Sequence, residues 1–453
     1  MDKEDESLFT FFCLKPMKRK KAISICTRIG VYMKLIRRIF NYSLIFTLLL
    51  FFVVSGYAET TAIKAGKLVD PENGTTSVNQ IILVEDNTIK AIGQNIPIPT
   101  GSTVIDLSKH TVLPGLFDAH SHLCHNVAPA QSQLFNTLET PTAYRAILGV
   151  ANARTMLESG FTTVRDVGNN GNYADTALML AIDRGVVPGP TMINAGRIIA
   201  PFGGQFQIQP ERRGLSEPEY FFADTKDELK KAVRENIHYG ARVIKIVVDD
   251  QRYIYSVDDI KFVVEEARNA GLKVAAHCGT ERGARNAAEA GVASIEHGIQ
   301  MSDEALQLAK RNNVVLVGTE FPIKLAEYLG LPPEQAKEFH DVYVDRLKRA
   351  YKIGVPMVFG SDAFFDVKSE TRGEQALSVI DSFVEAGVAN KDLLRYMTTD
   401  AARLLGVDSR RGAIKVGLRA DIIATKENPL DTIQTLKKVS FVMKNGKVFK
   451  KSN

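Results

Sequence analysis

Short apolar runs alternate with longer amphipathic stretches through the middle of the chain. Short runs between polar turns predict buried strands, whereas apolar residues three and four positions apart predict helices. The expected strands are 112–117, 162–165, 191–195, 242–248, 273–276, 293–295, 314–317 and 356–359. The expected helices include 142–159, 226–239, 257–270, 283–290, 302–311, 333–352 and 374–386. This alternation indicates a parallel sheet of the α/β class, and eight units indicate a closed (β/α)₈ TIM barrel over 114–408.

The two ends of the chain have a different pattern, in which short strands follow one another without helices. At the N-terminal side these strands are 61–69, 80–85 and 88–92, and at the C-terminal side 420–425 and 439–448. Asn445-Gly446 is a strong hairpin signal within the last of them. We expect residues 59–113 and 409–453 to form one small β-sandwich domain, split in sequence and joined in space.

One strongly apolar run, residues 43–55, lies near the N-terminus, after Lys34, Arg37 and Arg38. The run is short for a membrane span. It is followed by Gly56-Tyr57-Ala58, with small residues at the −3 and −1 positions, which is the layout of a secretory signal cleaved after Ala58. Residues 1–58 are therefore expected to be a signal peptide region, with an uncleaved anchor as the alternative. Met33 would begin a signal of normal proportions, so residues 1–32 are a candidate for a misassigned start.

Composition adds few constraints. The 453 residues are enough for one large barrel and a small second domain. Much of the net charge of +5 comes from residues before the apolar run, so no nucleic-acid partner is expected.

Processing would leave Cys124 and Cys278, which could be bonded or could be two small buried hydrophobes. A periplasmic or secreted protein without a stable membrane anchor is expected, and homo-oligomerisation stays open.

Four of the eight histidines end expected strands, as does one aspartate. His120 and His122 close the first strand, and residues two apart in a strand point to the same side. His277 closes the fifth strand, His297 the sixth and Asp362 the eighth. The carboxyl ends of barrel strands converge on the active site. A lone histidine is usually a core residue, but this set is hard to explain as structure and predicts a metal site.

Lys245 lies in the fourth expected strand, between Ile244 and Ile246. Burying a lysine as a cation is costly. One interpretation is an ion pair with Asp249 or Asp250, or an amine that reaches outwards to solvent. The other is that CO₂ carboxylates the amine, and the resulting carbamate is an anionic ligand that can bridge two metals.

The motifs LPGLFDAHSHL, VIKIVV, VAAHC, SIEHG and FGSDA resemble those of the metal-dependent amidohydrolase superfamily. The expected split β-sandwich around a barrel resembles it too. The resemblance extends over about 62–450. The segments GFTTVRDVGN and EAGVASIEHGIQM are most similar to sequences of the branch of imidazolonepropionase-like proteins and Xaa-Pro dipeptidases.

The resemblance implies two divalent metal ions. His120, His122 and Asp362 would hold the more buried ion, and His277 and His297 the more exposed one. Carboxylated Lys245 and a hydroxide would bridge them. Two cations lower the pKa of a bridging water and polarise the scissile carbonyl, and Asp362 would act as the catalytic proton shuttle. Imidazole and carboxylate ligands suit zinc, with iron, manganese and cobalt left open.

One departure concerns the loop after the third strand. The dipeptidase branch usually has Gly-Gly-His there, whereas this chain has FGGQ at 202–205. Gln205 can donate a hydrogen bond but cannot titrate or bind metal as imidazole does. His125, Arg252, Tyr253 and Tyr255 are further candidates for the pocket, with solvated loop residues as the favoured alternative for each.

The function expected from these residues is hydrolysis of an amide or peptide bond in a dipeptide or other small molecule. A dipeptidase that releases a C-terminal residue, acting on Xaa-Pro or similar substrates, is the leading candidate. Hydrolysis of a lactam, a carbamate or a phosphotriester is the alternative on the same site. Lys245 argues against a mononuclear deaminase. The complete ligand set argues against a catalytically inactive periplasmic binding protein.

Overall fold

The computed structural model divides the chain into residues 1–58 and 59–453. It describes Met33 and residues 60–128, 133–168, 170–205 and 209–451. The expected apolar run and the expected cleavage site lie outside the described residues. Within the described part, no helix combines the length and the apolar character needed to cross a membrane.

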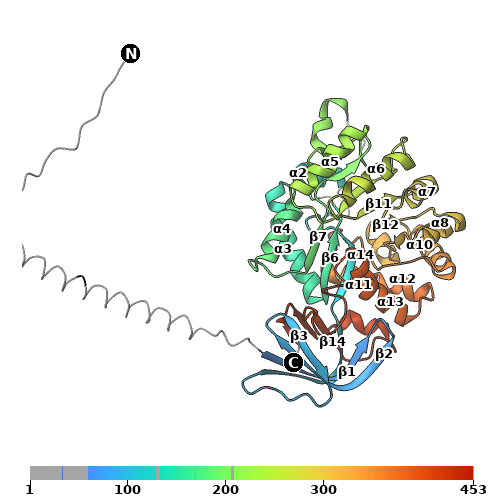
Figure 1. Cartoon of the computed structure of the whole chain (residues 1–453). Coiled ribbons are helices and arrows are strands. Elements are labelled where there is room, and N and C mark those ends of the chain that lie inside the picture. Colours follow the sequence, from blue (N-terminus) through green and yellow to red (C-terminus); the bar gives the residue numbers. More distant parts are fainter. Residues whose placement is uncertain (1–32, 34–59, 129–132, 169, 206–208, 452–453) are drawn as a thin grey trace, which may run out of the picture. The chain divides into compact units, whose positions relative to one another are not determined.

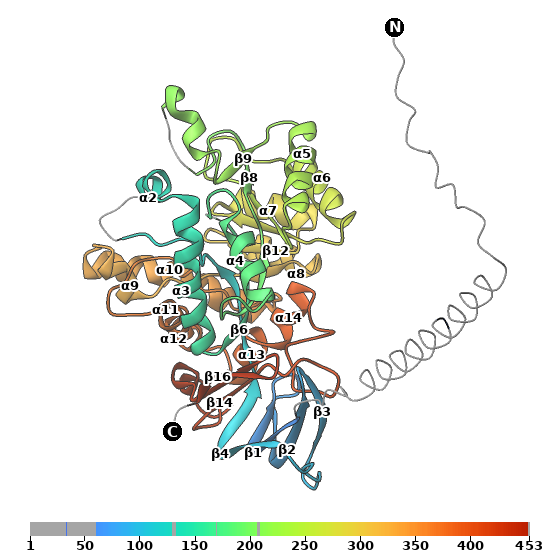
Figure 2. The ribbon, with the colours of Figure 1, turned by 90° about the vertical axis from the view of Figure 1, so that its left-hand side faces the viewer.

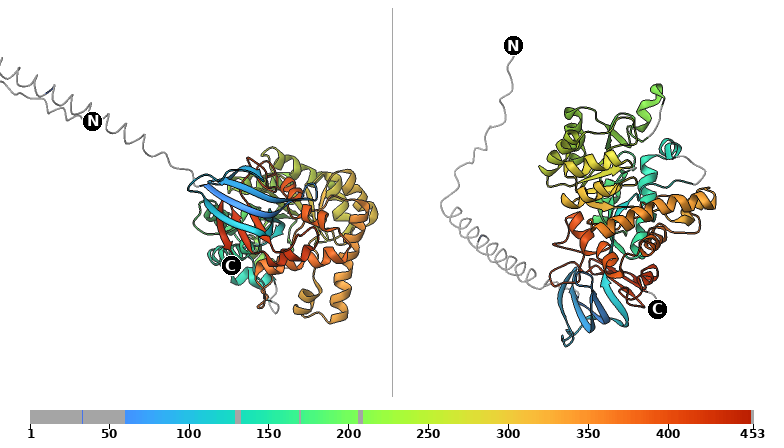
Figure 3. Two further views of the ribbon diagram at one scale, coloured as in Figure 1. Left: turned by 90° about the horizontal axis from the view of Figure 1, so that it is seen from below. Right: turned by 90° about the vertical axis from the view of Figure 1, so that its right-hand side faces the viewer.

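Strands from both ends of the chain pair in one seven-stranded sheet of order β16-β15-β14-β4-β1-β2-β3 (Figure 1). β4 joins the ends, because it pairs parallel with β1 and antiparallel with β14 (Figure 3). The expectation that the ends meet in space is thus met, because their strands form one continuous sheet among the described residues. The two-layered packing of a β-sandwich stays a prediction. Its strands are β1 Thr60–Asp70, β2 Thr75–Glu85, β3 Thr88–Gly93, β4 Thr103–Pro114, β14 Ile422–Thr425, β15 Phe441–Lys444 and β16 Lys447–Lys451.

Alternation of apolar and polar residues gives this sheet two different faces. Ile63, Ile82 and Phe441 are among the residues that form a buried cluster on one side. Ile423 and Val442, which alternate with members of that cluster, belong instead to the large core shared with the α/β part of the molecule. Burial on both faces therefore attaches the sheet to the part that carries the strand-end residues.

The α/β part contains two parallel sheets, of order β13-β12-β11-β10-β8-β9 and β5-β6-β7. The strands are β5 Leu116–Ser121, β6 Phe161–Asp166, β7 Thr191–Asn194, β8 Ile198–Ala200, β9 Tyr220–Phe222, β10 Ile244–Val247, β11 Val274–Cys278, β12 Ser294–His297 and β13 Val315–Val317. β8 and β9 were not expected from the sequence and lie side by side (Figure 2). The arrangement is α/β and TIM-barrel-like.

The eighth expected strand, 356–359, does not form a regular strand. Met357 makes only an isolated bridge to Leu316, and Ala363 one to Ser121. Pro356 has no N–H to donate, which limits regular pairing at the start of this segment. The expected closed barrel is therefore present as two sheets. Backbone hydrogen bonds still link the segment to β13, through Val358 N–H and Leu316 O, and to β5.

Helices follow most strands and pack around the sheets (Figures 1 and 2). Thr225, Ser256 and Thr371 cap three of them, each accepting a hydrogen bond from a backbone N–H three residues further on. The expected helix 374–386 is divided at Val379 into two helices. The helices are α2 Gln133–Glu139, α3 Thr142–Glu158, α4 Ala174–Asp183, α5 Lys226–His238, α6 Val257–Arg268, α7 Glu281–Ala290, α8 Asp303–Arg311, α9 Ile323–Tyr328, α10 Pro333–Ile353, α11 Arg372–Ser378, α12 Ile380–Glu385, α13 Asn390–Tyr396 and α14 Thr399–Leu405, with 3₁₀ turns η1 Pro210–Ser216 and η2 Ile433–Lys438.

Candidate metal centre

The register of the parallel strands brings the strand-end residues side by side. His277 of β11 lies opposite Val247 of β10, and His297 of β12 lies opposite Cys278 of β11. On the other side, Asp362 donates its backbone N–H to His120 O at 2.8 Å, which fixes the last segment beside β5. Strand ends that are far apart in sequence therefore share one small region.

Three donor atoms lie close together in this region. His120 Nε2 and His122 Nε2 are 3.2 Å apart. Asp362 Oδ1 lies 3.1 Å from His122 Nε2 and 3.6 Å from His120 Nε2. Tetrahedral ligands about 2.1 Å from a zinc ion are separated by roughly 3.4 Å. The spacing of the three atoms therefore fits a common metal ion.

The Nδ1 atoms of the two rings face hydrogen-bond acceptors, which leaves the Nε2 atoms directed at the cluster. His122 Nδ1 lies 2.8 Å from the carbonyl oxygen of Gly168, which can only accept, and His120 Nδ1 lies 2.7 Å from Glu296 Oε2. In a neutral imidazole the other nitrogen, Nε2, then carries a lone pair. Two lone pairs and a carboxylate so close together repel one another unless a positive charge lies between them. The donor set thus fits a divalent cation.

The pKa shifts of the two histidines have opposite directions, and only that of His120 favours the neutral ring. Burial lowers the pKa of His120 to about 4, so this ring is neutral at pH 7. Burial also opposes protonation of His122, but hydrogen bonding and attraction to Asp362 outweigh it and raise the pKa of His122. A proton on His122 can supply the positive charge that a bound cation would otherwise provide.

His277 and His297 extend the cluster. Their ring centroids are 4.5 Å apart, and those of His120 and His297 are 4.9 Å apart. His120, His297 and Asp362 each offer a ligand atom within 4.8 Å of the others. Nδ1 of His297 also hydrogen-bonds Thr319 Oγ1 at 2.7 Å. All four strand-end histidines and Asp362 therefore lie in one group, as the sequence predicts.

Lys245 is buried, with 3% of its surface exposed. Burial lowers the pKa of its amine, in the direction that carboxylation by CO₂ requires. The alternative ion pairs are absent among the described residues. Asp249 accepts hydrogen bonds from the backbone and hydroxyl of Thr280, and Asp250 accepts one from Gln205. Attraction to Glu296 and Asp362 opposes the pKa shift of Lys245 but is outweighed by burial. Among the described residues Lys245 thus makes no ion pair with Asp249 or Asp250.

A buried ion pair that the sequence reasoning missed supports His120. Glu296 Oε1 accepts from Arg165 Nη2 at 2.7 Å, while Oε2 faces His120 Nδ1. Arg165 also donates to Ser294 Oγ at 2.8 Å. Burial raises the pKa of Glu296, but Arg165 and His120 outweigh it and hold this pKa well below its usual range. The sequence offered one indication of this pair: Glu296 lies in a strand expected to be buried, and a buried charge needs a partner.

Four non-glycine residues at this site have left-handed backbone conformations. Their φ angles are 96° at Asp250, 65° at His297, 52° at Thr319 and 52° at Asp362. Such conformations cost roughly 1–3 kcal/mol each and cluster at functional sites. Their presence on several strand ends around one cluster supports a functional centre.

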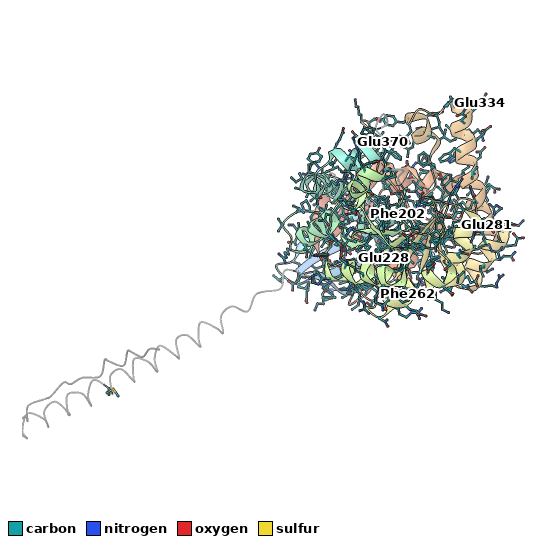
Figure 4. The ribbon with its side chains drawn as sticks, turned by 90° about the horizontal axis from the view of Figure 1, so that it is seen from above. Phe202, Glu228, Phe262, Glu281, Glu334 and Glu370 are labelled. Carbon is teal, nitrogen blue, oxygen red and sulfur yellow. The ribbon has the colours of Figure 1, made fainter. Side chains whose placement is uncertain are left out.

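The remaining pocket candidates differ in their surroundings. His125 is buried and packs against Phe364, whose ring also contacts His122, so the solvated alternative is wrong for His125. It is also wrong for Tyr255, which is buried and donates to Ala223 O at 2.6 Å. Arg252 and Tyr253 are exposed, which agrees with the interpretation of solvated loop residues. Phe202, just before the Gly-Gly-Gln loop, lies near the middle of the face in Figure 4, with Glu281 and Glu334 towards its rim.

The two cysteines are not bonded to each other. Cys124 and Cys278 are both free and buried. This agrees with the interpretation of small buried hydrophobes.

Residues 111–449 match the model of the amidohydrolase family. This chain belongs to the amidohydrolase family. An ochratoxinase of Aspergillus niger is 27% identical over 434 residues, covering 87% of each chain. An imidazolonepropionase of Symbiobacterium thermophilum is 25% identical over 377 residues, covering 76% of this chain and 82% of its own length. A Xaa-Pro dipeptidase crystal structure with bound methionine superimposes with a TM-score of 0.75 at 29% identity, covering 86% of this chain and 100% of the dipeptidase.

These relatives agree with the superfamily branch that the motifs indicate. This chain is therefore an enzyme that hydrolyses carbon–nitrogen bonds. The metal-ligand groups at the strand ends agree with the metal dependence that the resemblance implies.

Proposed function

We propose that this amidohydrolase is an exported, binuclear metal-dependent hydrolase of amide or peptide bonds, with dipeptides as its leading substrate class. The observation that carries the proposal is the convergence of His120 Nε2, His122 Nε2 and Asp362 Oδ1 within 3.1–3.6 Å of one another. His277 and His297 lie beside that group. In the proposed enzyme the two parallel sheets and the segment 356–362 act as one barrel.

The proposed ligand sets are those that the resemblance to the amidohydrolase superfamily implies. His120, His122 and Asp362 would hold the more buried ion, and His277 and His297 the more exposed one. A carbamate on Lys245 would join the two sites, because it is anionic and offers two oxygens. Zinc is the proposed metal, since imidazole and carboxylate donors suit it.

Two bound divalent ions would make a water acidic enough to attack at neutral pH and would polarise the substrate carbonyl. Asp362 would accept the proton of the attacking water and donate it to the leaving amine. Glu296 holds the proton of His120 on Nδ1 and so keeps Nε2 free as a ligand atom. Arg165 keeps Glu296 ionised, which preserves this tautomer.

Dipeptides are expected to be hydrolysed, with Xaa-Pro sequences leading. The support is the similarity to a Xaa-Pro dipeptidase structure over 86% of this chain. The test is a panel of dipeptides, N-acyl amino acids, lactams, carbamates and phosphotriesters, assayed with added zinc by release of product. The matched blank is the same protein after metal removal by a chelator. Turnover of a lactam or phosphotriester without release of any amino acid would reject the dipeptidase proposal.

Export is expected to leave Glu59 as the first residue of the mature protein. The basis is the basic, apolar and small-residue order that ends at Ala58. Mass spectrometry of the N-terminus, on protein purified from the periplasm and medium of the native host, would test it. The control is a variant with Ala58→Arg, which should block cleavage at this position. Recovery of the wild-type chain with residues 43–55 retained in the membrane fraction would contradict export with cleavage.

A further inference from the structure

The loop after β10 places an aspartate beside one ring nitrogen, Nε2, of a proposed metal ligand. Asp250 Oδ2 lies 2.8 Å from His277 Nε2. An ionised carboxylate can only accept hydrogen bonds, so the contact requires His277 to carry its proton on Nε2. The lone pair of a neutral His277 is then on Nδ1. His120 and His122 have the opposite arrangement, because their Nδ1 atoms face acceptors.

Gln205 holds the same carboxylate oxygen. Its Nε2 donates to Asp250 Oδ2 at 2.7 Å, and its Oε1 accepts from the hydroxyl of Tyr220 at 2.8 Å. Tyr220 is fully buried and stacks on Phe222, with ring planes 5° apart. The glutamine that departs from the Gly-Gly-His pattern is therefore one member of a chain of contacts that runs from a buried tyrosine to His277.

The backbone of the loop is also fixed. Asp250 has a φ of 96°, a conformation that a non-glycine residue adopts only when its surroundings impose it. The preceding residue, Asp249, anchors the loop to the end of β11 by accepting from Gly279 N–H and Thr280 N–H, each at 2.8 Å. Gln251 adds a hydrogen bond to Gly204 O at 2.8 Å. Contacts on both sides of Asp250 thus hold its carboxylate against the ring.

We propose that Asp250 is a positioning residue for His277, held in place by Gln205, and that it fixes the ring so that His277 binds the more exposed metal through Nδ1. The inference rests on the proposed binuclear function. A carboxylate on the outer nitrogen of a metal-bound histidine fixes its orientation and increases its basicity, and loss of such a partner costs roughly 10–100-fold in metal affinity or activity. Asp250 thereby has the role for His277 that Glu296 has for His120.

The alternative is that Asp250 itself is a ligand, because Asp249, Asp250 and His277 also offer atoms within 4.8 Å of one another. The hydrogen-bond count argues against it. Oδ2 of Asp250 already accepts two hydrogen bonds. The Asp249 carboxylate accepts three, including one from Thr280 Oγ1 at 2.6 Å.

The test measures the two metal affinities of the full mature protein by competition with a chelator, and the absorption spectrum of the cobalt-substituted protein. Asp250→Ala is expected to weaken the more exposed metal roughly 10–100-fold while the more buried metal keeps its affinity. Asp250→Asn retains an acceptor oxygen and should show a smaller loss. Gln205→Ala should shift the same site in the same direction, by less than Asp250→Ala. Asp258→Ala removes an exposed aspartate at the start of α6 and is the matched control, which should change neither affinity.

The ¹⁵N chemical shifts of His277 in the metal-free protein provide a readout that does not depend on activity. They should report a proton on Nε2 in the wild type and a mixture of tautomers in Asp250→Ala. Unchanged affinities in Asp250→Ala, equal losses at both metals, or an Asp250 oxygen within about 2.2 Å of zinc in the loaded crystal would overturn the inference alone. Failure of the wild-type protein to bind two metal ions would overturn the proposed function and this inference with it.

Discussion

Replacing Lys245 with alanine is expected to remove about one metal ion per chain and nearly all hydrolytic activity. Lys245 is buried, and neither Asp249 nor Asp250 accepts a hydrogen bond from it among the described residues. A protonated amine there would repel two cations, and a neutral amine could not readily bridge both. A carbamate would be anionic and could offer one oxygen to each ion. The measurement is metal content by mass spectrometry together with turnover of the best substrate in the panel.

The controls for Lys245→Ala separate loss of a bridge from general damage. Lys261→Ala removes an exposed lysine on α6 and should leave metal content and turnover unchanged. Short carboxylates added to Lys245→Ala should restore part of the activity by replacing the carbamate. Electron density for an unmodified amine pointing away from two fully occupied metal sites, in crystals grown with bicarbonate, would contradict the bridging role.

Asp362→Asn is expected to lose roughly 10²–10⁴-fold in turnover while a metal site remains. Asp362 Oδ1 lies within 3.6 Å of His120 Nε2 and closer to His122 Nε2, so its carboxylate is placed both to bind metal and to move a proton. An amide oxygen can still be a weak ligand, but an amide cannot take up the proton of the attacking water. Turnover should be compared at equal metal content.

Asp366→Asn is the matched control, because it neutralises an exposed aspartate on the same segment. It should keep wild-type turnover. The shuttle role of Asp362 would be wrong if the metal-loaded Asp362→Asn variant retained near-normal turnover. A full loss of metal from that variant would show that ligation by Asp362 dominates over proton transfer.

The parts of the site that depend on local pattern could be predicted from the sequence. A strand period of two places His120 and His122 on one side, and the carboxyl ends of parallel strands share one edge. These two rules place the histidines of β5, β11 and β12 together without any distance information. The motif resemblance adds the family, which the match over residues 111–449 shows.

The contacts that depend on distant partners could not be predicted in this way. Arg165 is 131 positions from Glu296, and Gln205 is 45 positions from Asp250. No periodicity specifies which buried arginine meets which carboxylate. Loop burial was missed for the same reason, because His125 and Tyr255 look polar enough for solvent but pack under neighbouring segments. The prediction of an eighth strand at 356–359 was wrong because hydrogen bonding, rather than hydrophobicity, defines a strand. Pro356 has no N–H to donate to a neighbouring strand.

The position of β4 within its sheet constrains when the protein can finish folding. Ile422 of β14 pairs with Pro114 of β4, so neighbouring strands are separated by most of the chain. During synthesis from the N-terminus, β1 to β4 exist long before their partners β14 to β16, and β4 has an open edge until the last residues emerge. Contacts of such long sequence separation form slowly, because a large loop must close first. A nascent chain of this amidohydrolase therefore has an unpaired edge strand throughout translation, and a deletion of the final strands would leave that edge exposed to other chains.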